Sequence, residues 1–304
     1  DMNVNKFKRP LAAILFAGTV AMPAAAAHAA PMQAFKTPEA AMDAFGAAII
    51  DNDEAAKQAI VGTNYRAVIP PVDADSRYRF LENWAQSHKV KMDGETRARI
   101  AVGDSGWTLP IPLVKTKAGW LFDMKAGKEE ITIREIGRNE LAAIKVASAF
   151  VDAQREYAAR DWNGDGVREY ARKIISSAGH KDGLYWPDAA GQEASPLGPL
   201  LARAAAEGRI KQPGSYHGYR YRILTTQGPQ ATGGARDYII DGRMTGGFGL
   251  IMWPAQFGQT GVMTFIVNQE GQVFEKNLGP DTAEKVARLH SFDPDASWRK
   301  VDNP

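Results

Sequence analysis

The sequence predicts an α+β protein of two parts, each with helices first and antiparallel strands after them. Three observations lead to this class. Apolar residues recur at helical spacing in residues 38–88 and again in residues 140–160. They alternate with polar residues in the stretches that follow each of these segments. The 304 residues, 44% of them apolar, are also enough for two domains with buried cores.

The first part, residues 33–136, begins with helices. Thr37 as N-cap and Pro38 as first helical residue mark the start of the first one. The expected helices are residues 38–50, 54–61 and 75–88, and the expected strands of a curling antiparallel sheet are residues 97–102, 107–113 and 120–122. His88, the only histidine of this part, lies at the end of the third expected helix. We interpret it as a packing or surface residue rather than a catalytic one.

The second part, residues 137–300, begins with a long helix. Asn139 is expected to cap this helix, which runs over residues 140–160 and has a buried apolar stripe. The expected strands of a meander sheet are residues 219–224, 237–241, 247–253, 261–267 and 272–276, followed by a short helix over residues 281–289. The boundary between the parts is expected at residues 136–139, before the fresh helix cap.

The N-terminus has the features of a signal peptide. Three basic residues lie between positions 6 and 9, and residues 11–22 form an apolar stretch too short to span a bilayer comfortably. Ala27-His28-Ala29 supplies the small residues that favour cleavage before Ala30. Residues 1–29 are therefore expected to be removed and the mature protein to be periplasmic. An uncleaved membrane anchor is the alternative.

Charge and cysteine content exclude several classes of protein. The leader accounts for the formal net charge of +2, so the remaining chain is neutral and has no basic excess for binding nucleic acid or anionic lipid. The absence of cysteine excludes a disulfide scaffold, a cysteine nucleophile and an iron–sulfur protein. No other apolar run of 18 or more residues occurs, so no membrane span is expected in the mature chain.

One loop has the pattern of a calcium site. Asp161, Asn163 and Asp165, followed by a glycine, reproduce the first half of the calcium-binding pattern D-x-[DN]-x-[DN]-G. Glu169, at loop position nine, is the fourth candidate ligand. Position twelve is an arginine, so the bidentate glutamate of an EF-hand is missing. The alternative is a turn rich in Asp, Asn and Gly that is satisfied by its own backbone. Calcium is the only cofactor that the sequence suggests.

A second group of candidates consists of polar and aromatic residues in the loops beside the second sheet. Converging loops can form a ligand cleft, although aromatic residues near Gly and Pro also pack loops onto a core. The candidate ligand-binding residues are His180, Tyr185, Trp186, His217 and Tyr219. No catalytic residue is assigned, because the sequence has no serine in a nucleophile motif, no His-Glu-x-x-His and no phosphate-binding loop.

Two segments resemble known folds. Residues 37–60, TPEAAMDAFGAAIIDNDEAAKQAI, together with GWLF at 119–122, resemble the nuclear transport factor two-like superfamily. This resemblance implies a cone-like domain that often encloses a pocket. Residues 150–171, FVDAQREYAARDWNGDGVREYA, and the strands after them resemble the globular domain of type IV pilins and pseudopilins. Pilins begin with their long helix, whereas here a whole domain precedes it, which argues against filament assembly.

Residues 35–298 as a whole resemble a family of exported bacterial proteins known only as domain of unknown function 2950. The most specific stretches are LPIPLVK at 109–115, IGRNELAAI at 136–144, FVDAQ at 150–154, DGLYWP at 182–187 and GVMTFIVN at 261–268. The resemblance implies the domain arrangement, and it implies no activity.

The expected function is binding or interaction in the cell envelope without catalysis. The expected partner is an envelope protein or a small ligand, and not nucleic acid. The alternative is a periplasmic hydrolase or isomerase that uses a pocket in the first domain. A buried Asp–His pair in a sealed pocket would favour the enzyme. A pocket without titratable groups, or an exposed apolar patch, would favour binding.

Overall fold

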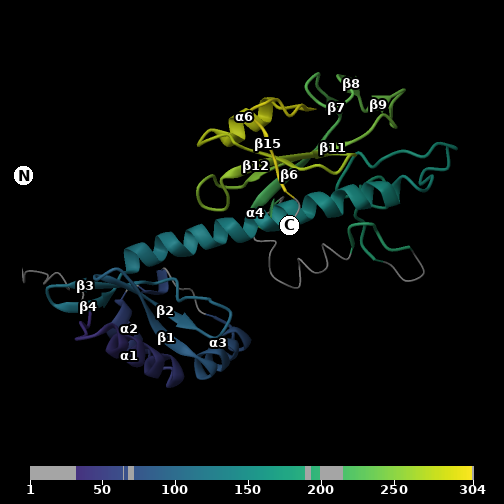
Figure 1. Ribbon diagram of the computed structural model, residues 1–304. Coiled ribbons are helices and arrows are strands. Elements are labelled where there is room, and N and C mark those ends of the chain that lie inside the picture. The colour runs from purple at the N-terminus through teal and green to yellow at the C-terminus, as the bar shows by residue number, and fades with distance from the viewer. Residues whose placement is uncertain (1–31, 64, 68–71, 189–192, 199–214, 303–304) are drawn as a thin grey trace, which may run out of the picture.

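The computed structural model describes residues 32–63, 65–67, 72–188, 193–198 and 215–302. The expected leader, residues 1–29, and the expected cleavage site before Ala30 lie outside the described residues. The α+β class is confirmed, because the helices pack on sheets whose strands are mostly antiparallel. One long helix, α4 (Met124–Tyr157), connects a first part (residues 32–123) to a second part (residues 158–302), as Figure 1 shows. Among the described residues, no helix has both the length and the apolar character to cross a membrane.

The first part consists of three helices and one sheet. The helices are α1 (Pro38–Ile50), α2 (Glu54–Val61) and α3 (Ala74–Gln86), with a 3-10 turn, η1 (Tyr65–Ala67), before α3. The strands β1 (His88–Asp93), β2 (Arg97–Val102), β3 (Leu113–Thr116) and β4 (Gly119–Phe122) form an antiparallel sheet in the order β1-β2-β3-β4. The Thr37 hydroxyl caps α1 by accepting a hydrogen bond of 3.1 Å from the N–H of Ala40. Buried Phe45, Ile100 and Phe122 belong to the core of this part.

Strand β1 corrects the expected end of the third helix. The helix was expected to continue to His88, but it ends at Gln86, and Ser87 is already extended with φ −161° and ψ 134°. His88 instead begins β1, which pairs with β2 along its whole length. Apolar and polar residues do not alternate clearly in the sequence of β1. Only Val90 is half-buried and the other side chains of the strand are exposed, so the strand does not need an apolar face.

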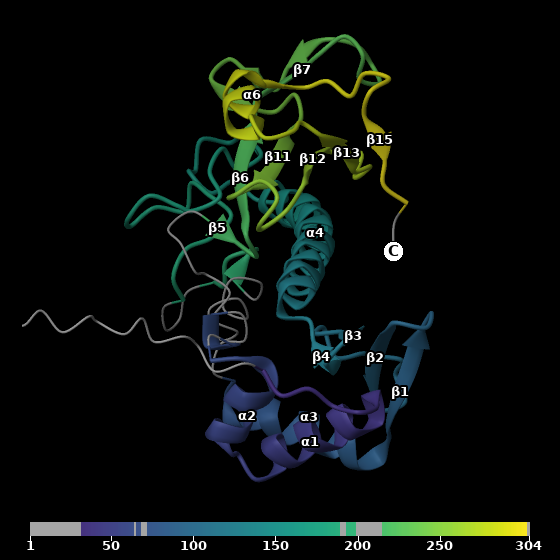
Figure 2. The same ribbon diagram turned by 90° about the vertical axis from the view of Figure 1, so that its left-hand side faces the viewer.

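Helix α4 corrects the expected start of the long helix. It begins at Met124, where the Asp123 carboxylate caps it by accepting a hydrogen bond of 3.0 Å from the N–H of Ala126. Asn139 is therefore not a cap. It lies inside the helix, and its side chain donates a hydrogen bond of 2.9 Å to the carbonyl of Thr260 in the second part. The expected boundary at residues 136–139 falls within this continuous helix, between the two parts that Figure 2 shows at its ends.

The second part is built on a six-stranded antiparallel sheet in the order β15-β13-β12-β11-β6-β5. Its strands are β5 (Ser215–Tyr216), β6 (Tyr219–Leu224), β11 (Gly249–Pro254), β12 (Met263–Asn268), β13 (Phe274–Asn277) and β15 (Arg299–Lys300). The other elements of this part are the short strands β7 (Thr226–Gln227), β8 (Arg236–Asp237), β9 (Ile239–Ile240), β10 (Arg243–Met244) and β14 (Ser291–Phe292) and the helix α6 (Thr282–Arg288).

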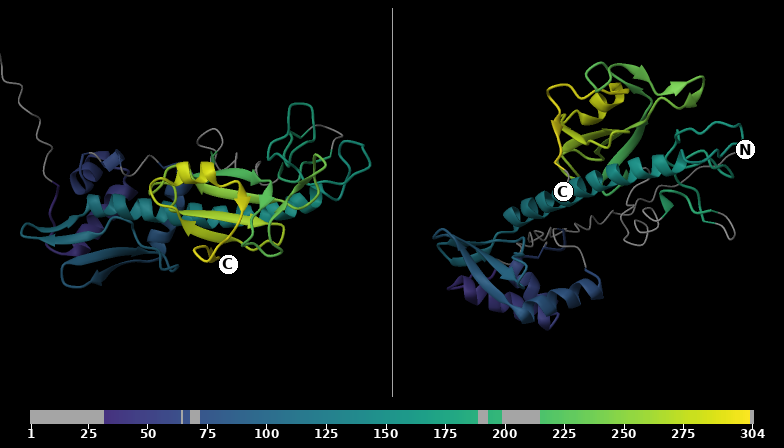
Figure 3. Two further views of the ribbon diagram at one scale, coloured as in Figure 1. Left: turned by 90° about the horizontal axis from the view of Figure 1, so that it is seen from above. Right: turned by 45° about the vertical axis from the view of Figure 1, so that its right-hand side comes forward.

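The two faces of this sheet are covered by different helices. Leu250 and Met252 of β11 belong to the core cluster that contains the second half of α4. Ile251, between them, belongs to a separate cluster with Val286 of α6. Successive side chains of a strand point to opposite faces, so the sheet lies between α4 and α6. Figure 3 shows the strands running along α4 in the view from above.

Candidate functional site

A cavity of about 850 Å³ lies in the first part of the chain. Its walls come from α1, α2, α3 and the segment 102–111, and one residue of α4, Ile131, also contacts it. Most of the lining is apolar, including Phe45, Val61, Phe80 and Ile111. The volume falls within the range of about 300–1,000 Å³ that is common for small-molecule sites in proteins.

An aromatic wall gives this cavity its shape. The ring of Phe80 on α3 lies 5.7 Å from the ring of Trp84 and 6.3 Å from the ring of Trp107, between ring centroids. The Trp84 ring comes so close to α1 that a Cβ atom at Gly46 would lie 2.4 Å from its Cζ2 atom. Gly46 therefore allows α3 to pack tightly on α1, and this packing presents Phe80 to the cavity.

Two of the basic residues that line the cavity share one carboxylate. Lys57 and Arg66 each form an ion pair of 2.9 Å with Glu54, and the hydroxyl of Tyr65 donates a hydrogen bond to the same carboxylate. The bond from Lys57, with those from Tyr65 and Arg66, lowers the pKa of Glu54 from 4.5 to about 2. Burial, followed by the bond to Glu54, raises the pKa of Tyr65 to about 12. This cluster ties η1 to α2 at the edge of the cavity.

Two further arginines of the lining are on α3 and pair with no carboxylate among the described residues. Arg77 donates through Nη2 to the carbonyls of Ile49 and Ile50, at 3.1 Å each, at the end of α1. Its Nε atom is buried and has no hydrogen-bond partner. The Nη2 atom of Arg79 lies 3.4 Å from the hydroxyl of Ser76.

The described lining of the cavity contains no Asp–His pair. Among its described lining residues there is no histidine, aspartate or glutamate, although Tyr65 and four basic side chains are present. His88 is not part of this lining. Its ring stacks on Trp84 with centroids 4.6 Å apart, and its Nδ1 atom lies 2.8 Å from the Trp84 carbonyl oxygen. His88 is thus an exposed residue whose ring packs on Trp84.

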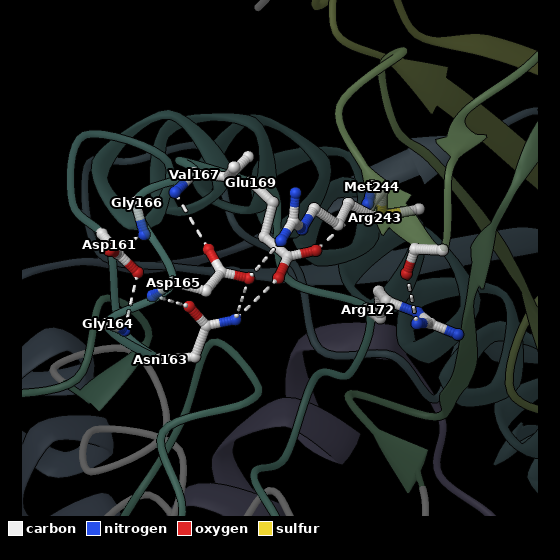
Figure 4. A network of polar contacts seen from close by, with 11 residues as sticks. Asp161, Asn163, Gly164, Asp165, Gly166, Val167, Glu169, Arg172, Arg243 and Met244 are labelled. Atoms are coloured by element: carbon white, nitrogen blue, oxygen red, sulfur yellow. Dashed lines mark hydrogen bonds and ion pairs between the residues drawn. The ribbon is translucent and has the colours of Figure 1, made fainter.

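The expected calcium loop forms a turn that is bonded to its own backbone (Figure 4). The two oxygens of Asp161 accept hydrogen bonds from the N–H groups of Gly164 and Gly166, at 2.8 and 2.7 Å. The bond from Gly166 is the main reason why the pKa of Asp161 is lowered. In the same way, Asn163 accepts a bond from the N–H of Asp165 at 3.1 Å. These are the side-chain-to-backbone bonds of Asx turns.

The other acids of this loop attach it to the hairpin of β9 and β10. Arg243 forms an ion pair of 2.9 Å with Asp165. Glu169 accepts a bond of 3.1 Å from the N–H of Met244, and Arg172 donates to the carbonyl of Gly242. No group of three or more His, Cys, Asp or Glu side chains in the described chain is arranged to hold a metal ion. The oxygens of this loop are thus bonded within the protein in this structure, and calcium binding stays a prediction of the sequence.

The five candidate ligand residues are not brought together into one site. His180 is exposed and lines a polar hollow of about 300 Å³ that Asn163 and Glu169 also line. Trp186 is buried, and its indole N–H donates to the carbonyl of Glu193 at 2.9 Å. Tyr185 is a half-buried loop residue, and His217 lies in the turn between β5 and β6. Tyr219 is a core residue whose hydroxyl donates to the carbonyl of Met263.

The residues that line the cavity in the first part were not predicted from the sequence. They come from α1, α2, α3 and the segment 102–111, and no local spacing shows that these segments meet. One local signal was present. Arg77 lies three residues before Phe80 and seven before Trp84, so a cation occupies the apolar face of an amphipathic helix. Such a position is uncommon for arginine unless its charge has a partner.

Fold and cavity together define an α+β protein of two parts that carries a pocket of small-molecule size in its first part. The family model described as "Protein of unknown function (DUF2950)" matches residues 32–301, and the chain belongs to this family. No curated protein and no solved structure was found to match the chain. The likenesses of the two halves to nuclear transport factor two-like domains and to pilins therefore stay resemblances in sequence.

Proposed function

We propose that this chain is an exported, periplasmic binding protein that holds a small ligand in the cavity of its first part and catalyses no reaction. The cavity of about 850 Å³ with its largely apolar lining is the observation that carries the binding role. Pockets of this size and character are the usual sites of small ligands. The basic, apolar and Ala-x-Ala segments of the N-terminus support export.

Binding is preferred over the alternative, a hydrolase or isomerase, on the chemistry of the lining. General acid–base catalysis needs a group that titrates near the working pH and lies within hydrogen-bond reach of the substrate. The described lining offers arginines, a lysine and a tyrosine, but no carboxylate or imidazole. Burial and the bond to Glu54 raise the pKa of that tyrosine, Tyr65, to about 12, which takes it further from the range of a general base at neutral pH.

An envelope protein and calcium, the other predicted partners, are less well supported than a small ligand. A small ligand is favoured over an envelope protein, because the cavity is hollowed mainly out of one part of the chain and is lined by several of its helices together with residues 102–111. Calcium has no role in the proposed binding, since the Asp161 loop belongs to the second part and its oxygens are bonded to backbone groups and to Arg243.

Native mass spectrometry of the full chain purified from the periplasm tests this function. We expect a small molecule to remain bound to the wild-type protein. Ile49→Trp, which places an indole in the cavity wall, should abolish the bound mass. Ile50→Trp is the matched control, because Ile50 is the next residue of α1, is 53% exposed and is not part of the lining. A wild-type protein without bound mass, or an Ile49→Trp variant that keeps it, contradicts the proposal.

A further inference from the structure

We propose that the ligand is an anionic amphiphile, with an apolar chain along the aromatic wall and an anionic head held by Arg77 and Arg79. This inference rests on the proposed function, since it names the class of ligand for the same cavity. It is carried by the charges of the lining and by the position of Arg77 and Arg79 beside apolar side chains of the same cavity.

The charged residues of the described lining are all basic. Four basic residues contribute to it, and the described lining holds no acidic residue. The residues of this part that are not described, 64 and 68–71, have no acidic side chain in the sequence. Glu54 lies beside the cavity, where it pairs with Lys57 and Arg66. One carboxylate for four cations leaves an excess of positive charge, which attracts an anion.

Arg77 has a donor that the protein leaves without a partner. Its Nη2 atom is used by the carbonyls of Ile49 and Ile50, whereas its Nε–H is buried and unbonded. A buried donor without an acceptor costs free energy, and buried nitrogens without a partner are rare in native proteins. Because Nε has almost no accessible surface, a carboxylate in the cavity would reach Arg77 through its Nη1 atom, for which no hydrogen bond is found among the described residues. Arginine suits this role because its planar group presents several donors to one anion.

Arg79 adds a second charge on the same helix. Among the described residues its guanidinium has no ion pair, and its only hydrogen bond is the long one to Ser76. The charge of Arg79 helps to lower the pKa of Asp73, although the main cause is that Asp73 accepts bonds from the backbone and the hydroxyl of Ser76 as the cap of α3. Asp73 therefore has its own donors, and the Arg79 charge remains available to a ligand.

The neighbours of the two arginines indicate an amphiphile rather than a small inorganic anion. Phe80 follows Arg77 by three residues on α3, so the two side chains lie next to each other on the helix surface. Phe45, Val61 and Ile111 continue the apolar wall away from them. A ligand that satisfies both the cations and this wall must carry an anionic head on an apolar chain. Binding would then combine a charge-assisted hydrogen bond with apolar burial.

Isothermal titration calorimetry on the full chain tests the inference with three probes below their micelle concentrations. Dodecanoate has the head and the chain, dodecanol has the chain alone, and acetate has the head alone. We expect dodecanoate to bind at least about tenfold more tightly than dodecanol, and acetate to give no heat. Equal affinities for dodecanoate and dodecanol overturn the anionic head but leave the proposed binding function. Absence of binding by both overturns the amphiphile, whereas the binding function itself is decided by the mass bound to the purified protein.

Two variants assign the head to its residues. Arg77→Met and Arg79→Met should each weaken dodecanoate binding, by about tenfold for Arg77, and leave dodecanol binding unchanged. Arg97→Met is the control for net charge, since Arg97 is exposed on β2 and is not in the lining. Arg79→Met keeps the test decisive if Arg77→Met fails to fold, because within the described part of the chain the exposed Arg79 guanidinium bonds only to Ser76. Unchanged dodecanoate affinity in folded variants overturns the inference.

Discussion

Glu54 shows how a single side chain links the stability of the cavity edge to pH. Its carboxylate accepts bonds from Lys57, Tyr65 and Arg66, and these bonds keep its pKa at about 2 instead of 4.5. A group whose pKa is lower in the folded state stabilises that state while it is ionised. The stabilisation is therefore complete above pH 4.5 and is lost as the pH falls towards 2.

Glu54→Gln removes this ionisation, and its effect should depend on pH. The wild-type protein should be more stable than the variant at neutral pH, and the difference should shrink as the pH falls from 4.5 towards 2. Urea denaturation at a series of pH values measures the difference. A constant difference from pH 7 to pH 3 would show that the ionised carboxylate does not hold η1 to α2.

The Asp161 loop yields a prediction that separates its two interpretations. Asp161→Ala removes the acceptor of two backbone N–H groups, so it should lower the melting temperature. If the loop is a turn, the loss should be the same with millimolar calcium chloride as with a chelator. Thermal melts of both proteins under both conditions decide this. A rise in the wild-type melting temperature that needs calcium, and that the variant lacks, would instead support a calcium site.

At the residue scale, the sequence predicted local chemistry better than assembled sites. A turn bonded to its own backbone was one of the two interpretations of the Asp161 loop. It could be foreseen because Asp and Asn side chains accept hydrogen bonds from backbone N–H groups two to five residues further along the chain. The cavity was not foreseen in its residues. Arg77 meets the end of α1, 27 and 28 residues away in sequence, and such contacts follow from tertiary packing alone.

At the scale of single elements, helix α4 holds the main departure from expectation. The residues before position 139 were assigned to no helix, because Gly127 and Gly137 and a run of charged residues weaken the apolar period. The helix nevertheless runs unbroken for 34 residues. Contacts from the interior of the helix to both parts stabilise it, since Arg134 donates to the carbonyl of Thr108 at 2.7 Å and Asn139 to that of Thr260. Tertiary contacts have here outweighed local propensity.

The two glycines of α4 provide a matched pair of variants. A Cβ at Gly137 would meet no atom within 4 Å, so Gly137→Ala should stabilise the protein by about 0.5–1 kcal/mol. A Cβ at Gly127 would lie 2.9 Å from Cγ1 of Ile111, so Gly127→Ala should destabilise it by about 1 kcal/mol or more. Chemical denaturation measures both. A destabilising Gly137→Ala would indicate that the helix is interrupted at that position.

Other elements were predictable because their patterns are local. The capped helices α1 and α2, the strands β2, β6, β11 and β12 and the short helix α6 lie where the periodicity placed them, within a few residues. The expected strand at 107–113 is wrong except for its last residue, because β3 runs over Leu113–Thr116 and most of the residues from 107 to 111 line the cavity. An edge strand with exposed side chains, β1, left too weak a pattern to be found.

For the whole molecule, the position of the buried cores bears on how the chain divides. The core of the first part contains buried residues from Phe35 to Phe122, and the core clusters of the second part begin at Ala143. Between them, Arg134 binds the first part and Asn139 binds the second. We therefore keep residues 136–139 as the proposed boundary, although it cuts a helix.

This division predicts that each part folds alone. Fragments 33–136 and 137–300 should each show cooperative melting, because each keeps its core and the segment of α4 that contacts it. Circular dichroism with thermal melts of the separately produced fragments provides the measurement. If both fragments are unfolded, the two parts depend on each other for stability and the proposed boundary is wrong.

Export also concerns the molecule as a whole. Signal peptidase should cut after Ala29, so terminal sequencing of protein from the periplasm should read Ala-Pro-Met-Gln. Mutation of Ala29 to a bulky residue such as phenylalanine should slow this cleavage. Recovery of the intact leader in the membrane fraction of the wild-type strain would support the anchor instead.

Photo-crosslinking tests most directly the central claim that the cavity of the first part binds a ligand. Dodecanoate carrying a diazirine is irradiated with the full chain, and the modified peptides are identified by mass spectrometry. The account predicts adducts in α3 and in residues 102–111, and their loss when unlabelled dodecanoate competes. Adducts confined to residues 158–302, or adducts that unlabelled dodecanoate does not displace, would contradict it.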